Sequence, residues 1–196
     1  MLMLPASSFW SHFLRVNRLD RHCRWLGLPG MEFRARAAWW GKAARPAPHE
    51  GIDLLFLVDS RGRRLALPPQ ALVVPLWEGE VVGLLDDFLG RTVVVRHPCA
   101  DEQGRTLVSL YAHVEPLVGQ GTRVRPDFPV ARIAPGKQRG KSGPPAHLHI
   151  SLAWLAAGYP VRELSWPTLW QNQAVELIDP LPVLPAPAGS AGSSCQ

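Results

Sequence analysis

The chain has 196 residues, of which 46% are hydrophobic and 19% are charged. At roughly 150 residues per domain, this length predicts one domain, alone or with an ordered extension, and the composition excludes a globally disordered protein. No apolar run reaches the ~18 residues that a membrane-spanning helix needs, so we expect no membrane span. The net charge of +5 comes from scattered arginines without a dense basic tract, which argues against nucleic acid as a partner.

The cysteines and the start of the chain say little about the cellular compartment. Cys23, Cys99 and Cys195 have no metal-ligand spacing, and their odd number argues against a disulfide framework, although a single bridge stays open. The start, MLMLPASSFWSHFLRV, lacks a basic region followed by a long apolar run and is therefore a poor secretory signal. We expect that export is either not encoded in this chain or that the true N-terminus lies upstream.

The first predicted element is an amphipathic helix over residues 8–26. Its apolar side chains recur at intervals of three and four, and Ser7 or Ser8 is a suitable N-cap. The segment 27–30, with two glycines and a proline, is expected to end this helix. Apolar and charged side chains then alternate over residues 31–39, and this period of two predicts a strand.

Short apolar runs separated by turns continue to about residue 154. They predict strands over residues 51–58, 71–77, 80–85, 91–97, 106–114, 129–134 and 146–154. A strand about every ten residues is typical of an antiparallel sandwich or barrel. The predicted fold class is therefore an all-β core with a short N-terminal helix. We expect residues 160–182 to be irregular with one short helix at most, and the tail 185–196 to be disordered.

Two histidines on the last predicted strand indicate a polar site. His147 and His149 are two residues apart, and side chains at this spacing project from the same face of a strand. Burying two adjacent imidazoles without partners is costly, which favours a metal ion or a wet cleft. Taken alone, this H-x-H pattern is weak.

His49 and Asp53 place an imidazole and a carboxylate at the entry to another predicted strand. Gly51 lies between them and allows the backbone to bend or to approach another segment closely. Zinc accepts such nitrogen and oxygen ligands, and a catalytic zinc site uses three of them and leaves the fourth position to water. One histidine of the H-x-H pair would complete the set, although an isolated H-x-x-x-D is more often a surface loop.

Tyr111 and His113 form a further pair two residues apart on a predicted strand. An imidazole beside a phenol suits the stabilisation of an oxyanion. The alternative for this pair is an aromatic residue and a histidine at the edge of a sheet, without a role in chemistry.

In chain order, HEGID at 49–53, YAH at 111–113 and HLHISL at 147–152 resemble the motifs of the lysostaphin/LytM-type zinc metallopeptidases. The resemblance covers about residues 46–154, with IDPL at 178–181 as a looser match. It implies that family's fold, a zinc cofactor, hydrolysis of peptide bonds in bacterial peptidoglycan stem or cross-bridge peptides, and a location in the cell envelope. The family's glycine- and threonine-rich turn before HLH is replaced here by residues 136–145, which leaves the preferred peptide bond open.

The resemblance also implies a role for each site residue. It makes His49, Asp53 and His149 the zinc ligands. It makes His147 the general base that takes a proton from the attacking water, and His113 a second catalytic histidine directed toward that water or the developing oxyanion. A neutral imidazole suits the role of general base, because zinc lowers the pKa of its bound water to about 7. The tyrosine of YAH is an accessory donor at most.

The predicted organisation is a helix-and-strand extension over 1–45 that packs on the core or covers the cleft, a metallopeptidase domain over 46–184 and a tail over 185–196. Two other functions stay open: a catalytically silent cell-wall-binding or regulatory module of the same fold, and a β-domain in which zinc is structural. The presence of all five site residues favours the enzyme. A structural site also needs a fourth protein ligand, and no obvious one stands beside the three. The oligomeric state stays open.

Several other patterns have simpler explanations. The basic segment 136–142 resembles a P-loop but lacks its glycine spacing and its following helix. His97–Cys99 fits a loop with a packed cysteine better than a metal site. Trp39–Trp40 precedes HEGID closely enough to line a cleft. Two acidic pairs fit turns and a solvated sheet edge better than a glycosidase site: Glu78 with Glu80, and Asp86 with Asp87.

Overall fold

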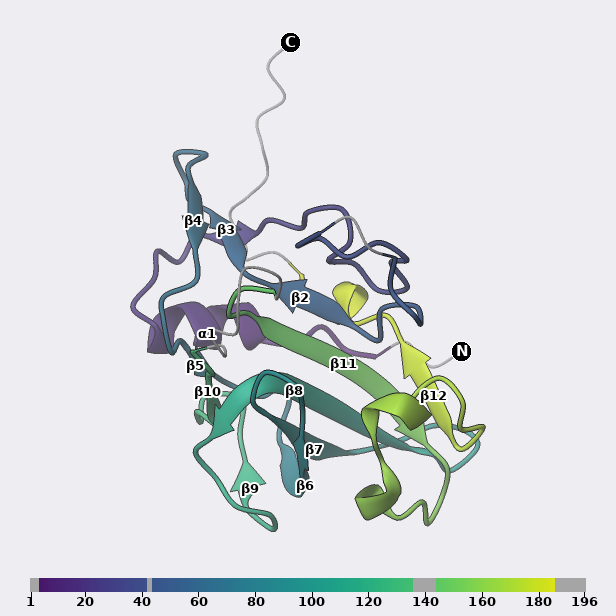
Figure 1. Ribbon diagram of the computed structural model, residues 1–196. Helices are drawn as coiled ribbons and strands as arrows, with labels where there is room; N and C mark the ends of the chain where they lie inside the picture. Colours follow the sequence, from purple (N-terminus) through teal and green to yellow (C-terminus); the bar gives the residue numbers. More distant parts are fainter. Residues whose placement is uncertain (1–3, 42–43, 136–143, 186–196) are drawn as a thin grey trace.

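A computed structural model describes residues 4–41, 44–135 and 144–185 (Figure 1). Within these ranges the chain forms one α-helix, α1 (Phe9–Val16), and the strands β1 (Arg24–Trp25), β2 (Ile52–Leu54), β3 (Phe56–Val58), β4 (Arg64–Ala66), β5 (Leu72–Val73), β6 (Gly79–Asp86), β7 (Arg91–Ala100), β8 (Thr106–Pro116), β9 (Arg123–Val124), β10 (Ala131–Ile133), β11 (Leu148–Leu155) and β12 (Val175–Ile178). Three short 3-10 segments cover Val161–Glu163, Trp166–Thr168 and Leu181–Val183.

The predicted all-β fold class is confirmed, since antiparallel strands make up the core. The main sheet has the strand order β12-β11-β8-β7-β6-β9, and its long central strands β11, β8 and β7 run side by side in Figure 1. β2 and β12 both pair with β11, along different stretches of it. β10 continues the sheet beyond β11 along β8 and also pairs with β5. A separate small sheet has the order β1-β3-β4.

The main sheet is covered on both faces, which explains why its strands are apolar almost throughout. On one face, side chains such as Val93, Tyr111 and Ile150 pack with helix α1 in the larger core cluster. On the other face, Val94, Leu110 and other residues pack in a second cluster with side chains from the irregular segment that precedes β12. Successive residues of each strand therefore go to opposite clusters, as the pleat of a strand requires.

The pairing of β2 with β11 brings two distant motifs together. Asp53 and His149 are direct partners in this antiparallel pair, so their side chains leave the same face of the sheet side by side. Gly51 allows this approach, because a Cβ at this position would overlap the backbone carbonyl of Ile150. The expectation that Gly51 permits a close backbone contact is confirmed.

A bulge in β8 turns His113 onto that same face. The register between β7 and β8 shifts in this region, and His113 has a positive φ of 63°. In a regular strand His113 would follow Tyr111 into the larger core cluster. The extra residue of a bulge reverses the alternation, so that His113 points away from the tyrosine and toward β11.

The predicted helix over residues 8–26 is correct at its start but wrong at its end. Ser8 is the N-cap, and the helix stops at Val16. The Asn17 side chain donates to the carbonyls of Phe13 and Leu72, which ties the end of the helix to β5. Arg18 has a positive φ of 54°, a left-handed conformation that ends an α-helix.

The predicted strand over residues 31–39 is wrong, because this segment forms turns and bends with one isolated bridge, Ala37 to Ala44. Its backbone groups pair with the HEGID segment instead: Asp53 donates its N–H to the carbonyl of Met31, and His49 donates its N–H to that of Ala35. The alternation of apolar residues over 31–39 reflects partial burial against the core rather than hydrogen bonding within a β-sheet.

The remaining predictions are mostly confirmed in outline. Every predicted strand between 51 and 154 contains a strand, but 71–77 is reduced to two residues and 51–58 is interrupted at Leu55. The short strands β1, β4, β9 and β12 were not predicted, and the segment 160–182, predicted to be irregular with one short helix at most, contains β12 and two 3-10 segments. His97–Cys99 lies inside β7, so the prediction of a loop there is wrong. The predicted tail 185–196 and the basic segment 136–142 lie almost wholly outside the described residues, and the division into domains stays a prediction.

Candidate metal centre and cleft

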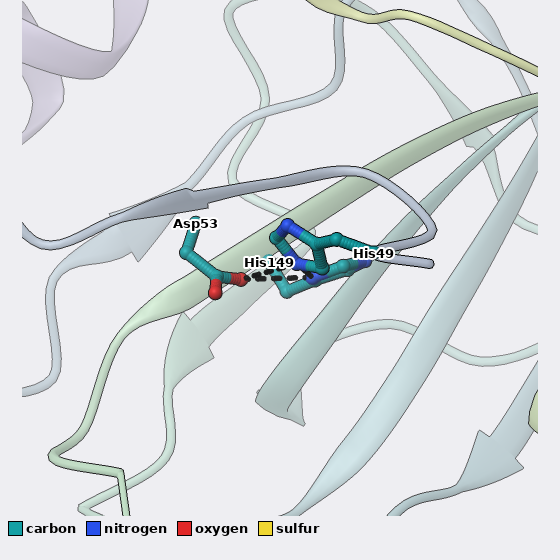
Figure 2. Close-up of side chains that lie close together, drawn as sticks. All are labelled: His49, Asp53 and His149. Carbon is teal, nitrogen blue, oxygen red and sulfur yellow. Dashed lines mark hydrogen bonds and ion pairs between the residues drawn. The ribbon is translucent and has the colours of Figure 1, made fainter. Parts of the chain in front are cut away.

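Three side chains from two distant motifs converge on one point (Figure 2). His49 Nε2 lies 3.1 Å from Oδ1 of Asp53, and His149 Nδ1 lies 2.9 Å from the same oxygen. The two ring nitrogens are 3.0 Å apart. All three residues are buried, and they form a group that is able to hold a metal ion. The structure therefore brings together the three residues that the sequence predicted as ligands.

Each histidine of this group, His49 and His149, has its other ring nitrogen engaged by the protein. Nδ1 of His49 lies 2.9 Å from the carbonyl oxygen of Glu32, to which it donates because a carbonyl only accepts. Nε2 of His149 lies 2.7 Å from Oγ of Ser151. With these nitrogens carrying the protons, Nε2 of His49 and Nδ1 of His149 direct their lone pairs at the centre. Such outer partners fix the ring orientation of metal-binding histidines.

The charges of the ligand groups suit a cation. Burial raises the pKa of the Asp53 carboxyl, but its contacts with the ring nitrogens of His147, His149 and His49 outweigh this and hold the pKa well below its usual value. Burial lowers the pKa of His149 to about 3, so its ring is neutral near pH 7. A carboxylate oxygen and ring nitrogens at such short separations attract one another only when a proton or a cation lies between them.

Two more histidines flank the ligand group. Nδ1 of His147 donates to the carbonyl of Pro145 at 2.7 Å, and its Nε2 lies 3.4 Å from Oδ1 of Asp53. The ring centroids of His147 and His113 are 4.7 Å apart, and those of His113 and His149 are 5.9 Å apart. The predicted shared face of His147 and His149 is confirmed, and His113 joins them there.

One functional side chain was missed, because Asp87 was assigned with Asp86 to a solvated edge. The side chain of Asp86 is 94% exposed, but that of Asp87 is fully buried. Oδ1 of Asp87 lies 3.0 Å from Nδ1 of His113. Burial raises the pKa of Asp87, but the hydrogen bond with His113 outweighs it and holds this pKa well below the usual value. Burial also lowers the pKa of His113.

Tyr111 does not belong to this site. Its hydroxyl is buried in the core, where it accepts the N–H of Leu76 at 2.6 Å and lies 2.9 Å from Oγ of Ser109. Burial raises its pKa. The role of accessory donor at the oxyanion is therefore wrong, and the reason is the bulge that separates this tyrosine from His113.

A cavity of about 320 Å³ opens onto the histidines. Its walls are largely apolar, and its polar side chains are concentrated at the metal centre. Trp40 lines it, as expected for the Trp39–Trp40 pair, and Phe88 lies at its rim with 62% of its surface exposed. Glu50 is the other carboxylate of the wall, and burial raises its pKa.

No helix in the described part of the chain is long and apolar enough to cross a membrane. The described cysteines, Cys23 and Cys99, are free thiols. The acidic residues Glu78 and Glu80 lie away from the metal centre, beside Arg96 and a different surface hollow.

No protein-family model matches the chain, and no curated protein matches it. Solved structures do. The chain is similar to a zinc-containing peptidase from Vibrio cholerae, with 20% identity and a TM-score of 0.44, over 69% of this chain and 36% of that one. It is similar to the catalytic domain of the antimicrobial peptidase lysostaphin from Staphylococcus simulans, with 15% identity and a TM-score of 0.46, over 80% of this chain and 88% of that one. In a longer lysostaphin structure, with 18% identity and a TM-score of 0.45, the match covers 84% of this chain and 57% of the other. The chain thus spans about a third of the Vibrio protein and little more than half of the longer lysostaphin.

Proposed function

We propose that the chain is a zinc metalloendopeptidase that hydrolyses peptide bonds in the stem or cross-bridge peptides of bacterial peptidoglycan, and that it acts in the cell envelope. The observation that carries this proposal is the convergence of His49 Nε2, Asp53 Oδ1 and His149 Nδ1 beneath an open cleft, with two more histidines beside them. The substrate class and the location come from the resemblance of the HEGID, YAH and HLHISL motifs.

The donor set fits zinc. Two imidazoles and one carboxylate are ligands that zinc accepts, and three protein ligands are typical of a catalytic site. Within the part of the chain that the structure describes, the group consists of these three residues. When bound there, zinc supplies a Lewis acid that lowers the pKa of a water molecule to about 7 and polarises a carbonyl oxygen.

His147 is suited to take the proton of the attacking water. Its Nδ1 donates to the carbonyl of Pro145, so Nε2 is the ring nitrogen that faces Asp53 and the ligand group. A neutral imidazole in this place accepts a proton from water and later returns it to the amine that leaves when the peptide bond breaks.

His113 is suited to stabilise charge on the substrate oxygen. Asp87 engages its Nδ1, which leaves Nε2 as the free polar atom of the ring, and the ring lines the cleft. Burial lowers the pKa of His113, but the anionic Asp87 opposes this effect and favours a proton on Nε2, which could be donated to a developing oxyanion. The two non-ligand histidines thus supply different functions, one to the water and one to the carbonyl.

The test is digestion of purified peptidoglycan by the wild-type chain, with and without a chelator, and by His147→Ala. We expect release of peptide fragments that the chelator abolishes and zinc restores. His147→Ala should retain its zinc and lose about 10²- to 10⁴-fold in rate, the usual contribution of a positioned acid–base group. His22→Ala is the control, because this histidine is exposed and distant from the cleft. Release that resists the chelator contradicts the proposal, and bound zinc without any release favours the silent wall-binding module.

A further inference from the structure

The two oxygens of the Asp53 carboxylate face different parts of the molecule. Oδ1 faces the ring nitrogens of His49 and His149, as Figure 2 shows. Oδ2 accepts hydrogen bonds from Nε1 of Trp39 at 2.6 Å and from Nη2 of Arg45 at 3.2 Å. Asp53 is 1% exposed, so the protein rather than bulk water surrounds both oxygens.

Arg45 reaches Asp53 in a fixed orientation. Its Nη2 also donates to the carbonyl of Gly30 at 3.0 Å, and its Nε donates to that of Ala37 at 3.3 Å. The guanidinium lies over the ring of Trp40, 4.7 Å from the centroid. A planar guanidinium with several donors engaged has little freedom to turn. The hydrogen bond to Oδ2 is therefore pre-formed.

Trp39 is held in a similar way at the edge of the site. Its ring packs edge-on against the ring of His147, with centroids 5.3 Å apart, and edge-on against Trp40, with centroids 5.4 Å apart. The indole N–H points at Oδ2 because the backbone of this segment is tied to HEGID, where Asp53 donates its N–H to Met31. Both donors to Oδ2 thus come from the segment preceding the region of the motifs.

We propose that Trp39 and Arg45 are positioning residues of the metal centre, which hold Asp53 so that it binds the metal through Oδ1 alone. Two hydrogen bonds to the anionic carboxylate, one from the charged guanidinium and one from the neutral indole, stabilise Oδ2 where it is and turn its lone pairs away from the centre. A carboxylate free of these donors is able to rotate and offer both oxygens, which would occupy the position left for water. The inference rests on the proposed function in that it takes the metal to be zinc.

The test compares zinc affinity, measured by competition with a chromogenic chelator, in the wild-type chain, Trp39→Phe and Arg45→Met. Loss of an outer partner of a metal ligand typically weakens affinity about 10- to 100-fold, and we expect a loss in this range for each variant. Arg45→Lys keeps one donor and the positive charge but loses the planar guanidinium with its several donors. Its zinc affinity should therefore lie between those of Arg45→Met and the wild type.

Matched controls lie outside the site. Trp25→Phe removes an indole N–H that has no acceptor among the described residues, and Arg63→Met removes an exposed arginine that pairs with Asp59. Neither should change zinc affinity. As a second readout, cobalt(II) replaces zinc: its visible absorption should weaken in Trp39→Phe and Arg45→Met, because a second carboxylate oxygen raises the coordination number above four. If Arg45→Met does not fold, Trp39→Phe, which keeps an aromatic ring, carries the test alone.

Equal zinc affinity and equal cobalt spectra in Trp39→Phe and Trp25→Phe would overturn the inference. A wild-type chain that binds zinc but releases no peptide from peptidoglycan contradicts the proposed hydrolase only, since the affinity comparison still decides the role of Trp39 and Arg45. A wild-type chain that binds no metal overturns both.

Discussion

The carboxylate of Asp87 forms hydrogen bonds with both the ring and the backbone N–H of His113. Oδ1 of Asp87 pairs with Nδ1 of the ring at 3.0 Å, and Oδ2 accepts the backbone N–H of His113 at 2.9 Å. The carboxylate is itself fixed by the N–H groups of Leu89 and Gly90 and by the hydroxyl of Thr92. The turn between β6 and β7 therefore determines where the His113 ring points in the cleft.

This pairing predicts that Asp87→Asn lowers the rate of peptide release by about 10²-fold, at the lower end of what a positioned acid–base group contributes. An asparagine is neutral and no longer stabilises a proton on His113. Zinc content should be unchanged, because Asp87 does not touch the ligand group. Asp86→Asn is the matched control, since its side chain is 94% exposed. Equal rates in the two variants would show that His113 works without its carboxylate.

Tyr111→Phe should lower stability and leave hydrolysis intact. The change deprives the buried N–H of Leu76 of its acceptor, and an unsatisfied buried donor costs about 1–3 kcal/mol. Urea unfolding of the metal-free chain measures this loss, and peptide release from peptidoglycan measures the second half of the prediction. A drop in release without a drop in stability would instead make this phenol part of the site.

Gly51→Ala should lower both the stability of the protein and its affinity for zinc. The added Cβ would overlap the carbonyl of Ile150 and push β2 from β11, which separates Asp53 from His149. Overpacking of this kind typically costs about 1–3 kcal/mol. Gly119→Ala is the control, because a Cβ there meets no atom within 4 Å and φ is not positive. Unfolding and zinc titration of both variants check this, and matching results would contradict the close contact.

Lowering the pH should destabilise the metal-free chain through protonation of His97, in addition to any effect at the candidate metal centre. Burial lowers the pKa of this ring from 6.5 to about 4. The unfolded chain therefore takes up the proton first, and stability is lost as the pH falls from 6.5 toward about 4. A shift of this size corresponds to roughly 3 kcal/mol. Urea unfolding across this range should show a shallower pH dependence in His97→Gln, and parallel curves would refute the assignment.

The candidate ligands could be named from local motifs and from the family that these motifs resemble, which singles out His149 from the H-x-H pair. A period of two places His149 of β11 and His147, just before that strand, on one face, and HEGID supplies a partner strand that a glycine brings close. The distance between the motifs along the chain does not matter once these strands pair. The fold class followed in the same way, from the regular spacing of apolar runs and turns.

The features that could not be predicted from the sequence depend on strand register and on contacts between residues far apart in the chain. Asp87 is 26 residues from His113, and only the bulge in β8 brings that histidine to it and away from Tyr111. The alternating residues from 31 to 39 read as a strand, but their backbone groups bond to the HEGID segment. Asn17 ends the first helix through contacts with Leu72, 55 residues away, which no local pattern encodes.

We propose that His49, Asp53 and His149 hold one catalytic zinc ion. The zinc content of the purified wild-type chain, beside that of His49→Ala and His149→Ala, tests this proposal, with circular dichroism to show that all three fold. We expect one zinc per wild-type chain and its loss from both variants. Zinc retained at the wild-type level in both, or absent from the folded wild-type chain, would contradict it.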